Sequence, residues 1–553
     1  MYLRETRRTR KDGSTVRYLQ LAHNYRDPDT GHAIAKILYS FGRADLIDRA
    51  ALERLVASVS RFLDEEPPKS TSGEVEPVDG RDLGGAWVLD QLWDRLGIGK
   101  AIIKVARGRK LDAKAVERAL FALVASRALA PSSKLEATRW VREEVHIDGL
   151  AEIDTDSCYR AMDFLLETLP ELQETVFFTV ADLLRLHVDL LFFDTTSTYF
   201  ELEQGDIDPE DEDEPGFRSH GHSKDHRDDL PQAVIGMAVT RGGVPVRLWV
   251  WPGFTQDQTV LQEVKSDLAG WQLNRTVWVV DAGFASAENR QLLQAGGSGF
   301  IVAERLGGNE LEVAEARSRQ GRYRKIGEQL EVKEILLGEG PTTQRFIMCR
   351  NHEVARRDAA IRTKMIDLLT TRIAGSDQLT PTKRAELRGR LREKPGLNRY
   401  LRVTKSGLLR VDKTKIAAET ALDGKYLLRT SDLKIPAEDV ARGYKALADV
   451  ERGWRDMKQL ELRPIYHRRS DRIVGHVQLC WLALLLIRTI ENQVGDTWRN
   501  ISHELDRMQL ITLETATGTV SQRTRTTARQ RQILDKLGLP EPPRYFEFTP
   551  TGD

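Results

Sequence analysis

The most informative pattern in the chain is a run of four apolar residues, Leu190 to Phe193, that ends in Asp194 and continues into four small hydroxyl residues. An apolar run with polar residues on both sides predicts a strand that is buried on both faces of a sheet. A second apolar run, Val277 to Val280, ends in Asp281 in the same way. Because open α/β sheets bind ligands at the carboxyl ends of their strands, both aspartates are candidates for a functional site.

The pattern before these strands predicts three regions. Residues 1–64 contain two strand patterns, 16–22 and 33–41, and then a helix at 46–63, so we expect a small β-rich N-terminal segment. Residues 65–81 are rich in proline, serine and glycine and predict a polar linker. Residues 82–186 carry apolar positions at spacings of three and four and predict a helical domain.

The pattern after residue 187 predicts an α/β core that is interrupted once. Residues 187–304 alternate strands and helices and include a Gly-Gly hairpin between the strand patterns 233–240 and 244–251. Residues 305–424 break this alternation and predict an inserted subdomain. The core resumes at 425–495, where one long helix from Pro436 to about Leu460 carries Glu451. Residues 496–553 form a C-terminal tail region.

Length and composition describe an ordinary globular protein. The chain has 553 residues, of which 40% are hydrophobic and 30% charged, so we expect about two to four domains. The three cysteines are far apart and form no metal-binding spacing, which favours a reducing, cytoplasmic location. The first residues lack the apolar core of a signal peptide. The longest apolar run, 477–487, is too short to cross a bilayer and predicts a buried helix, so we expect no membrane partner.

The distribution of charged residues along the chain is more informative than the net charge. The chain has 83 lysines and arginines and 83 aspartates and glutamates, so its net charge favours no partner. Basic residues nevertheless cluster in 4–11, 317–325, 383–394 and 523–531, and one acidic block spans 201–214. Any single cluster is equally well explained as a solvated surface. Their repetition, interleaved with aromatic residues, favours a nucleic acid as partner.

Glu451 completes a set of three acids. Five residues of its helix share one face at steps of three, four and seven: Tyr444, Leu447, Glu451, Trp454 and Lys458. A glutamate inside a largely apolar stripe suggests that its side chain points into the protein, toward a group that needs a carboxylate. A solvated edge at which Glu451 pairs with Arg455 explains it equally well.

Together, Asp194, Asp281 and Glu451 have the chemistry of a site for two divalent ions. Mg²⁺ and Mn²⁺ prefer oxygen ligands, and a pair of such ions catalyses phosphodiester transfer. No Gly-rich phosphate loop of the GxxxxGK[ST] type is present, so we expect no use of a nucleotide triphosphate.

The chain resembles bacterial insertion-sequence transposases with a DDE triad, in the long-protein branch of insertion-sequence family four. That group has a signature of tyrosine, arginine, glutamate and lysine near its last acid, and Tyr444, Glu451 and Lys458 stand at the required spacings. Leu447 occupies the arginine position, and Arg452 or Arg455 could replace that arginine from the same helix. The resemblance also rests on segments that cover nearly the whole chain: 2–4, 38–43, 194–201, 221–232 and 280–284.

The resemblance implies an α/β, ribonuclease-H-like catalytic core with a mostly β insertion between the second and third acids. It implies that Asp194, Asp281 and Glu451 hold two Mg²⁺ or Mn²⁺ ions. The implied reaction is cleavage and strand transfer of double-stranded DNA at the inverted-repeat ends of an insertion sequence. Tyr444 and Lys458 are then expected to contact the DNA backbone, and a homodimer is expected to bring two ends together. The helical domain 82–186 is our candidate for binding the ends, because of its position and arginine content.

Other residues leave alternatives open. Lys224 and Arg227, beside Ser223, are candidates for phosphate contacts, as is Arg455 on the glutamate helix. The nearby histidines give only a weak prediction of zinc, because no fourth ligand has a clear spacing. Trp454 is a candidate for stacking on an unpaired base.

Two other functions remain possible from the residues. One is a transposase-derived protein that binds DNA without cutting it, which the leucine at position 447 leaves open. The other is a phosphatase of the haloacid-dehalogenase kind, in which Asp194 would carry the phosphoryl group.

Overall fold

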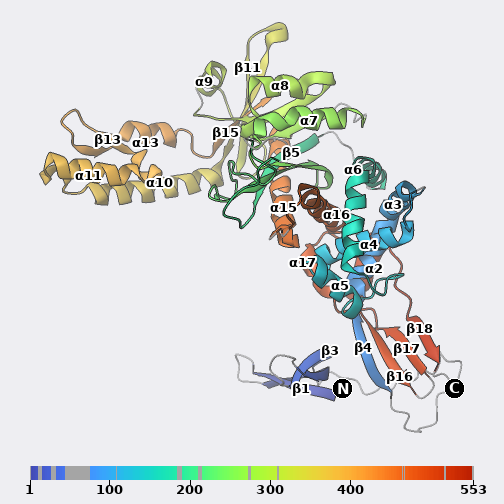
Figure 1. Cartoon of the computed structure of the whole chain (residues 1–553). Coiled ribbons are helices and arrows are strands. Elements are labelled where there is room, and N and C mark those ends of the chain that lie inside the picture. Colours follow the sequence, from blue (N-terminus) through green and yellow to red (C-terminus); the bar gives the residue numbers. More distant parts are fainter. Residues whose placement is uncertain are drawn as a thin grey trace. The chain divides into compact units, whose positions relative to one another are not determined.

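The chain divides into two compact units, Met1–Leu186 together with Arg455–Asp553, and His187–Trp454 (Figure 1). The computed structural model describes residues 2–9, 15–26, 33–43, 75–107, 109–183, 190–208, 214–271, 276–307, 310–463, 465, 467–515 and 518–550. The predicted helix 46–63 and most of the predicted linker lie outside these residues. The predicted domain boundary at residue 187 coincides with the division between the units.

A nine-stranded mixed sheet forms the centre of the second unit. Its strands, in spatial order, are β10 (Arg324–Lys325), β11 (Leu330–Leu337), β12 (Gln344–Asn351), β15 (Lys425–Thr430), β9 (Gly299–Glu304), β8 (Val277–Val280), β5 (Leu190–Tyr199), β6 (Gln232–Thr240) and β7 (Pro245–Pro252). Strand β5 is parallel to β8, and β8 is parallel to β9. The remaining neighbours are antiparallel. This mixed α/β sheet is consistent with the expected ribonuclease-H-like core.

Helices cover both faces of this sheet. On one face, Phe193 packs against Trp249, whose indole nitrogen donates to Asp267 of helix α7 (Asp257–Ala269). On the other face lies helix α14 (Ala437–Lys445), where a Cβ added to Gly443 would meet Leu190 at 3.1 Å. Because side chains alternate along a strand, Asp194 shares the α14 side with Leu190. Thr195 points to the α7 side.

The segment 305–424 corrects the prediction of a mostly β insertion, because its helices contain more residues than its strands. Strands β10, β11 and β12 extend the main sheet. Beyond them follow α10 (His352–Ile373), α11 (Pro381–Arg392), α12 (Pro395–Asn398) and α13 (Lys413–Thr420), with a small hairpin of β13 (Leu401–Val403) and β14 (Leu409–Val411). The Asn351 side chain caps α10, and Leu387 and Leu391 share one face of α11 at a spacing of four. The basic run 383–394 in this segment therefore lies mostly on the surface of α11.

The predicted long helix from Pro436 to Leu460 is broken. Helix α14 ends at Lys445, α15 (Ala448–Met457) begins after Ala446 and Leu447, and a π-helical turn, Lys458–Leu462, follows. The amide of Ala446 bonds to the carbonyls of Arg442 and Gly443, and the amide of Leu447 bonds to the carbonyl three residues earlier, which tightens the junction.

The first unit contains a helical bundle. Helices α2 (Gly84–Arg95), α3 (Ile98–Ala106), α4 (Ala113–Leu129), α5 (Lys134–Glu143) and α6 (Thr155–Leu183) occur where the sequence predicts a helical domain. Helix α16 (Ser470–Val494) packs against α4 and α6. It is long and apolar enough to cross a membrane, but 94% of its most apolar window is buried inside the protein. Helix α16 is thus a core helix, as predicted. The three cysteines are buried, and none of them forms a disulfide bond.

Two smaller sheets belong to the same unit. Strands β1 (Tyr2–Thr9), β2 (Thr15–Arg26) and β3 (Ala33–Arg43) form an antiparallel sheet. Strand β4 (Glu76–Asp82), expected within the linker, pairs instead with β16 (Gln509–Thr515). Strands β17 (Gly518–Arg523) and β18 (Tyr545–Pro550) complete that second sheet. The predicted tail region, 496–553, therefore contains β16, β17 and β18, and it also includes α17 (Trp498–Leu505) and α18 (Ala528–Leu537).

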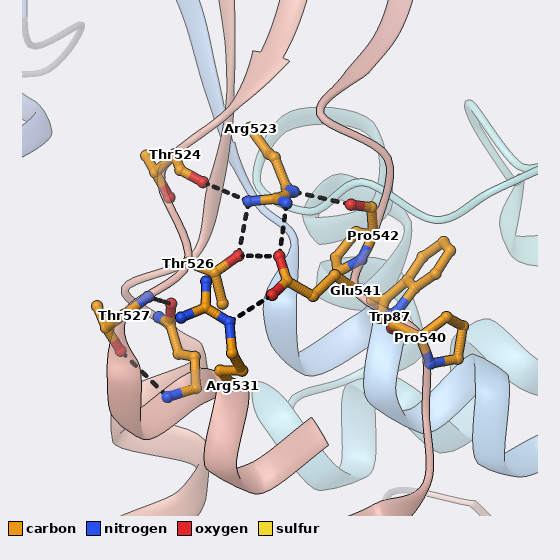
Figure 2. Close-up of polar contacts among 10 residues, drawn as sticks. Trp87, Arg523, Thr524, Thr526, Thr527, Arg531, Pro540, Glu541 and Pro542 are labelled. Carbon is orange, nitrogen blue, oxygen red and sulfur yellow. Dashed lines mark hydrogen bonds and ion pairs between the residues drawn. The ribbon is translucent and has the colours of Figure 1, made fainter. Parts of the chain in front are cut away.

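Glu541 links several segments of this C-terminal region through hydrogen bonds (Figure 2). Its carboxylate accepts hydrogen bonds from Arg523 Nη2 at 2.9 Å, from Arg531 Nε at 2.8 Å and from Thr526 Oγ1 at 2.8 Å. Arg523 also donates to the carbonyl of Pro542 at 2.8 Å. We call these four side chains, Arg523, Thr526, Arg531 and Glu541, the Glu541 clamp. The clamp accounts for two arginines of the basic cluster 523–531, which are bound within the protein.

Candidate functional site

Asp194 lies inside strand β5 and not at its end. The strand continues to Tyr199, so the prediction that it ends at Asp194 is wrong. The β-branched residues after Asp194 pair with β6, which extends the strand. The parallel pairing with β8 nevertheless stops at Phe192 opposite Val279. Asp194 therefore lies just beyond the paired part of two parallel strands.

Asp281 immediately follows β8, as predicted. Its Oδ1 accepts a hydrogen bond from the Gly283 amide at 2.8 Å and caps the short 3₁₀ turn Ala282–Phe284. No ion pair to Asp281 occurs among the residues that the structure describes. The two aspartates thus come from neighbouring parallel strands at the same edge of the sheet.

Lys224 is the cation that faces these acids. Its Nζ lies 3.6 Å from Asp194 Oδ1 and 3.1 Å from Asp257 Oδ2, and it donates to the Thr195 carbonyl at 2.8 Å. The Lys224 amide donates to Ser197 Oγ at 2.9 Å, which fixes the loop to β5. The sequence predicted a phosphate contact for Lys224, whereas its ammonium is engaged with carboxylates here.

Glycine 221 allows the loop that carries Lys224 to approach the sheet. A Cβ added there would stand 2.0 Å from the carbonyl oxygen of Gly253, which no side chain tolerates. His226, in the same loop, has a backbone φ of 58° and is thus in the left-handed region that non-glycine residues rarely adopt. This tightly folded loop holds Lys224 against the acids.

Asp257 is a site residue that the sequence reasoning missed. It is the first residue of α7, and its Oδ1 accepts a hydrogen bond from Thr195 Oγ1 at 2.5 Å. Acids are common in the first turn of a helix because they complement the helix dipole, so its sequence position looked ordinary. The signal that could have found it is the location of this helix start directly after β7.

Burial and like charges raise the pKa of Asp194 to about 6. Burial is the largest cause, and the charges of Asp281 and Asp257 act in the same direction, while Lys224 opposes them. Burial lowers the pKa of Lys224, but the charges of Asp194, Asp257 and Asp281 outweigh it, and the net direction is upward. The site therefore holds more negative charge than its single lysine balances.

Tyr444 connects the third acid to this group. Burial raises its pKa to about 12, and the charges of Asp281, Glu451 and Asp194 add to the rise. Its ring lies 5.9 Å from that of Tyr426 on β15. Tyr444 therefore lies within electrostatic reach of all three predicted acids, whereas Glu451 itself is exposed on α15.

The remaining predicted residues fall outside this group. Arg455 and Lys458 belong to the other unit, and the structure does not place them relative to the acids. Leu447, in the signature's arginine position, is buried with 7% exposure. Trp454 is 5% exposed, so base stacking is not available to it as it stands, and it is a core residue.

Arg227 is held by its neighbours. It makes an ion pair with Asp229 at 2.8 Å, and its guanidinium lies 5.1 Å from the centre of the Tyr199 ring. His220 and His222 line the cavity beside Lys224. They form no metal-binding group, since none occurs in the described part of the chain.

A cavity of about 630 Å³ opens beside these groups. Lys224, Asp257, Asp281 and Arg305 are among its lining residues. A cavity edged by carboxylates and basic groups has room for a polar substrate together with cations.

The acids suit divalent ions in their chemistry. Carboxylate oxygens are what Mg²⁺ and Mn²⁺ prefer, and three aspartates here face one lysine. Within the described residues, no three His, Cys, Asp or Glu side chains converge closely enough to coordinate one ion. In this structure the ammonium of Lys224, 3.6 Å from Asp194, provides positive charge that a metal ion would provide when bound. The carboxylate oxygens are therefore of the right chemical type for Mg²⁺ or Mn²⁺. Their side chains must change position before they can coordinate one ion together.

Two family models match the chain. The IS1634 family transposase N-terminal domain matches residues 3–72, and the Transposase DDE domain matches residues 213–486. The chain carries two transposase domains. Its domain content is that of an insertion-sequence DNA transposase. The DDE range contains Asp281 and Glu451 and begins after Asp194, and it does not single out the group with the Tyr-Arg-Glu-Lys signature.

Comparisons with individual proteins add little. The search of curated proteins finds no match. Among solved structures, the piggyBac transposase synaptic complex with hairpin DNA is similar with a TM-score of 0.35 and 10% sequence identity. The similarity covers 76% of this chain and 79% of that one. A TM-score below 0.5 does not establish a shared fold.

Proposed function

We propose that this transposase binds the inverted-repeat ends of an insertion sequence and catalyses metal-dependent cleavage and transfer of DNA strands. The observation that carries the proposal is the convergence of Asp194 and Asp281 from neighbouring parallel strands, next to a cavity, in a chain with a DDE domain. Buried like charges of this kind are costly and are typical of functional sites.

Asp194, Asp281 and Glu451 are the residues that would hold two Mg²⁺ or Mn²⁺ ions. When bound, such ions activate a water or a 3′-hydroxyl and stabilise the leaving oxygen of a phosphodiester. Because both aspartates come from neighbouring strands of one sheet, their backbone positions are fixed, and side-chain rotation would bring their carboxylates onto the ions. Glu451 is exposed on α15 and is free to turn toward them.

The surrounding residues bind and orient DNA. Tyr444, with a pKa near 12, keeps its hydroxyl proton at neutral pH and can donate a hydrogen bond to a phosphate oxygen. Lys224 neutralises part of the acidic group and can shift from Asp257 to a phosphate. Arg227, Arg455 and Lys458 are further candidates for backbone contacts. We also propose that two copies pair to hold two ends, in the cytoplasm of a bacterium.

The proposal is tested with DNA that carries the element's ends and with Mg²⁺. Asp194→Ala, Asp281→Ala and Glu451→Ala should each abolish cleavage, because each removes an expected ligand, while end binding persists. If all three variants cut DNA like the unsubstituted protein, the proposal fails.

A transposase-derived DNA-binding protein is the second candidate. The buried Leu447 favours it, because a leucine in the core cannot perform the contact of the signature's arginine. Normal end binding by the unsubstituted protein without any metal-dependent cleavage would support this candidate.

A further inference from the structure

Residues 352–424 form a small subdomain with its own core, which we call the basic arm. It comprises α10, α11, α12, the β13–β14 hairpin and α13 (Figure 1, yellow to orange). Its buried core consists of Leu369, Leu391, Leu397, Tyr400, Leu401 and Leu409. It adds no strand to the nine-stranded sheet and contributes no residue to the cavity beside Asp281. Its role must therefore lie in its surface.

The surface of the basic arm is strongly positive. The sequence 352–424 contains 17 lysines and arginines and 9 aspartates and glutamates, a net charge of +8. The whole chain has a net charge of zero, so the rest of the protein carries −8. The positive charge is thus concentrated in this one subdomain.

Most acids of the basic arm are already engaged inside it. Arg362 binds Asp423, Arg399 binds Glu419, and Arg410 binds Asp377. Asp412 caps α13, and Asp358 accepts a hydrogen bond from a backbone amide. The acids therefore neutralise few of the outward cations.

Four outward cations of helix α11, by contrast, have no side-chain partner in the described part of the chain. Helix α11 turns Leu387 and Leu391 to the core. Its other positions carry cations that are exposed and make no side-chain hydrogen bond or ion pair among the described residues: Lys383, Arg388, Arg390 and Arg392. A solvated face of ordinary composition would mix both signs of charge.

We propose that the basic arm binds the phosphate backbone of double-stranded DNA. The inference rests on the proposed function. It places part of the bound DNA on the basic arm, which is separate from the site formed by Asp194 and Asp281. Helix α11, which carries these four cations, has 12 residues and is therefore roughly 18 Å long, about half a turn of the duplex. Unpaired lysines and arginines along such a length match the charge of a duplex and carry no sequence preference.

The test uses the full chain and a nonspecific duplex, with binding measured over a range of salt concentrations. In Lys383→Glu/Arg388→Glu/Arg390→Glu, glutamate preserves helix propensity while it reverses three charges. We expect affinity at about 0.1 M salt to fall at least tenfold. The slope of log K against log salt should become shallower by up to about 3, since each phosphate contact contributes about 0.9.

A variant of opposite sign on the same helix is the matched control. Glu386→Lys/Glu393→Lys should bind DNA more tightly and with a steeper salt dependence. Circular dichroism and thermal unfolding of both variants check that the arm stays folded. If the triple reversal binds with unchanged affinity and slope while it remains folded, the basic arm is not a DNA surface.

The outcome is separable from the proposed catalysis. Arm reversals should still cut end DNA once the protein concentration saturates binding, because the acids are untouched. Asp281→Asn should show the opposite behaviour, with full binding and salt dependence but no cutting.

Discussion

Two clusters of carboxylates and cations in this protein have opposite balances of charge. In the Glu541 clamp, one carboxylate accepts hydrogen bonds from two arginines and a threonine. At the candidate site, Asp194, Asp257 and Asp281 share the single ammonium of Lys224. The pKa of Glu541 is lowered by its partners, and the pKa of Asp194 is raised by burial and by its acidic neighbours.

This difference separates a stabilising cluster from a functional one. A carboxylate with several donors gains stability when it is ionised. A buried group of carboxylates with too few cations costs stability, and such an arrangement is typical of a site that binds a further cation. Charge that is left unbalanced, at the acids of the candidate site and on the basic arm, is therefore a better guide to function in this chain than charge that is balanced, as in the Glu541 clamp.

The largest expected effect comes from Asp281→Asn. The change should slow metal-dependent cleavage at least about a hundredfold, because metal stabilisation of transition-state charge is worth several kcal/mol. The fold should remain, since the Asp281 side chain accepts a hydrogen bond from the Gly283 amide that an asparagine oxygen can also accept. Single-turnover cleavage measures the rate. Glu541→Gln is the control and should leave that rate unchanged, and an equal loss in both variants would remove the distinction between the clusters.

Asp257→Asn should have an intermediate effect. Asp257 is the acid nearest to Lys224, and residues that support metal ligands typically change activity by about 10–100-fold when replaced. The concentration of Mg²⁺ that gives half-maximal cleavage should rise. Asp257→Glu keeps the charge and should restore part of the activity. A variant with normal Mg²⁺ dependence would show that Asp257 does not support the site.

Asp194→Asn should stabilise the metal-free protein in a pH-dependent way. In the folded protein the pKa of Asp194 is about 6, above its ordinary value of 3.8. At pH values between these two, the Asp194 carboxylate therefore takes up a proton when the protein folds. The ionised form thus costs stability above about pH 6, by at most about 3 kcal/mol at 1.36 kcal/mol per pKa unit. Urea unfolding should show the variant to be more stable at pH 7.5 and similar to the unsubstituted protein at pH 4. A constant difference across this range would contradict the raised pKa.

Glu541→Gln should have the smallest effect, a loss of about 1 kcal/mol, because its side chain is partly exposed and solvent screens the interaction. Its lowered pKa means that the stabilisation is present above the ordinary value of 4.5 and disappears as the pH falls through the folded value. Thermal unfolding at pH 7 and pH 3 measures both features. Equal destabilisation at the two pH values would show that charge plays no part.

The sequence predicted the features that local patterns determine. The apolar run before Asp281 specifies a short buried strand, and the acid that follows stands where the sheet ends. Strand β5 was harder, because Thr195 to Thr198 are polar in composition but pair as a strand with β6. Hydroxyl residues that are β-branched can end or extend a strand, and the partner strand decides between these outcomes.

The sequence could not predict contacts that bring distant residues together. Lys224 and Asp257 are 33 positions apart and meet because a loop and a helix start converge on β5. The cations of residues 523–531 and those of α11 look alike as sequence. Arg523 and Arg531 are bound to Glu541, whereas four cations of α11 make no side-chain hydrogen bond or ion pair among the described residues. Tertiary structure determines which charges are neutralised, so the same composition gives a clamp in one place and a binding surface in another.

The most direct test of the central claim is a change of metal with Asp281→Cys. A thiolate binds Mg²⁺ poorly and Mn²⁺ better, because softer ligands favour transition metals. If Asp281 holds a metal ion, the variant should be inactive in cleavage of end DNA with Mg²⁺ and regain activity with Mn²⁺. Full cleavage by Asp281→Cys with Mg²⁺ would contradict the assignment of Asp281 as a metal ligand.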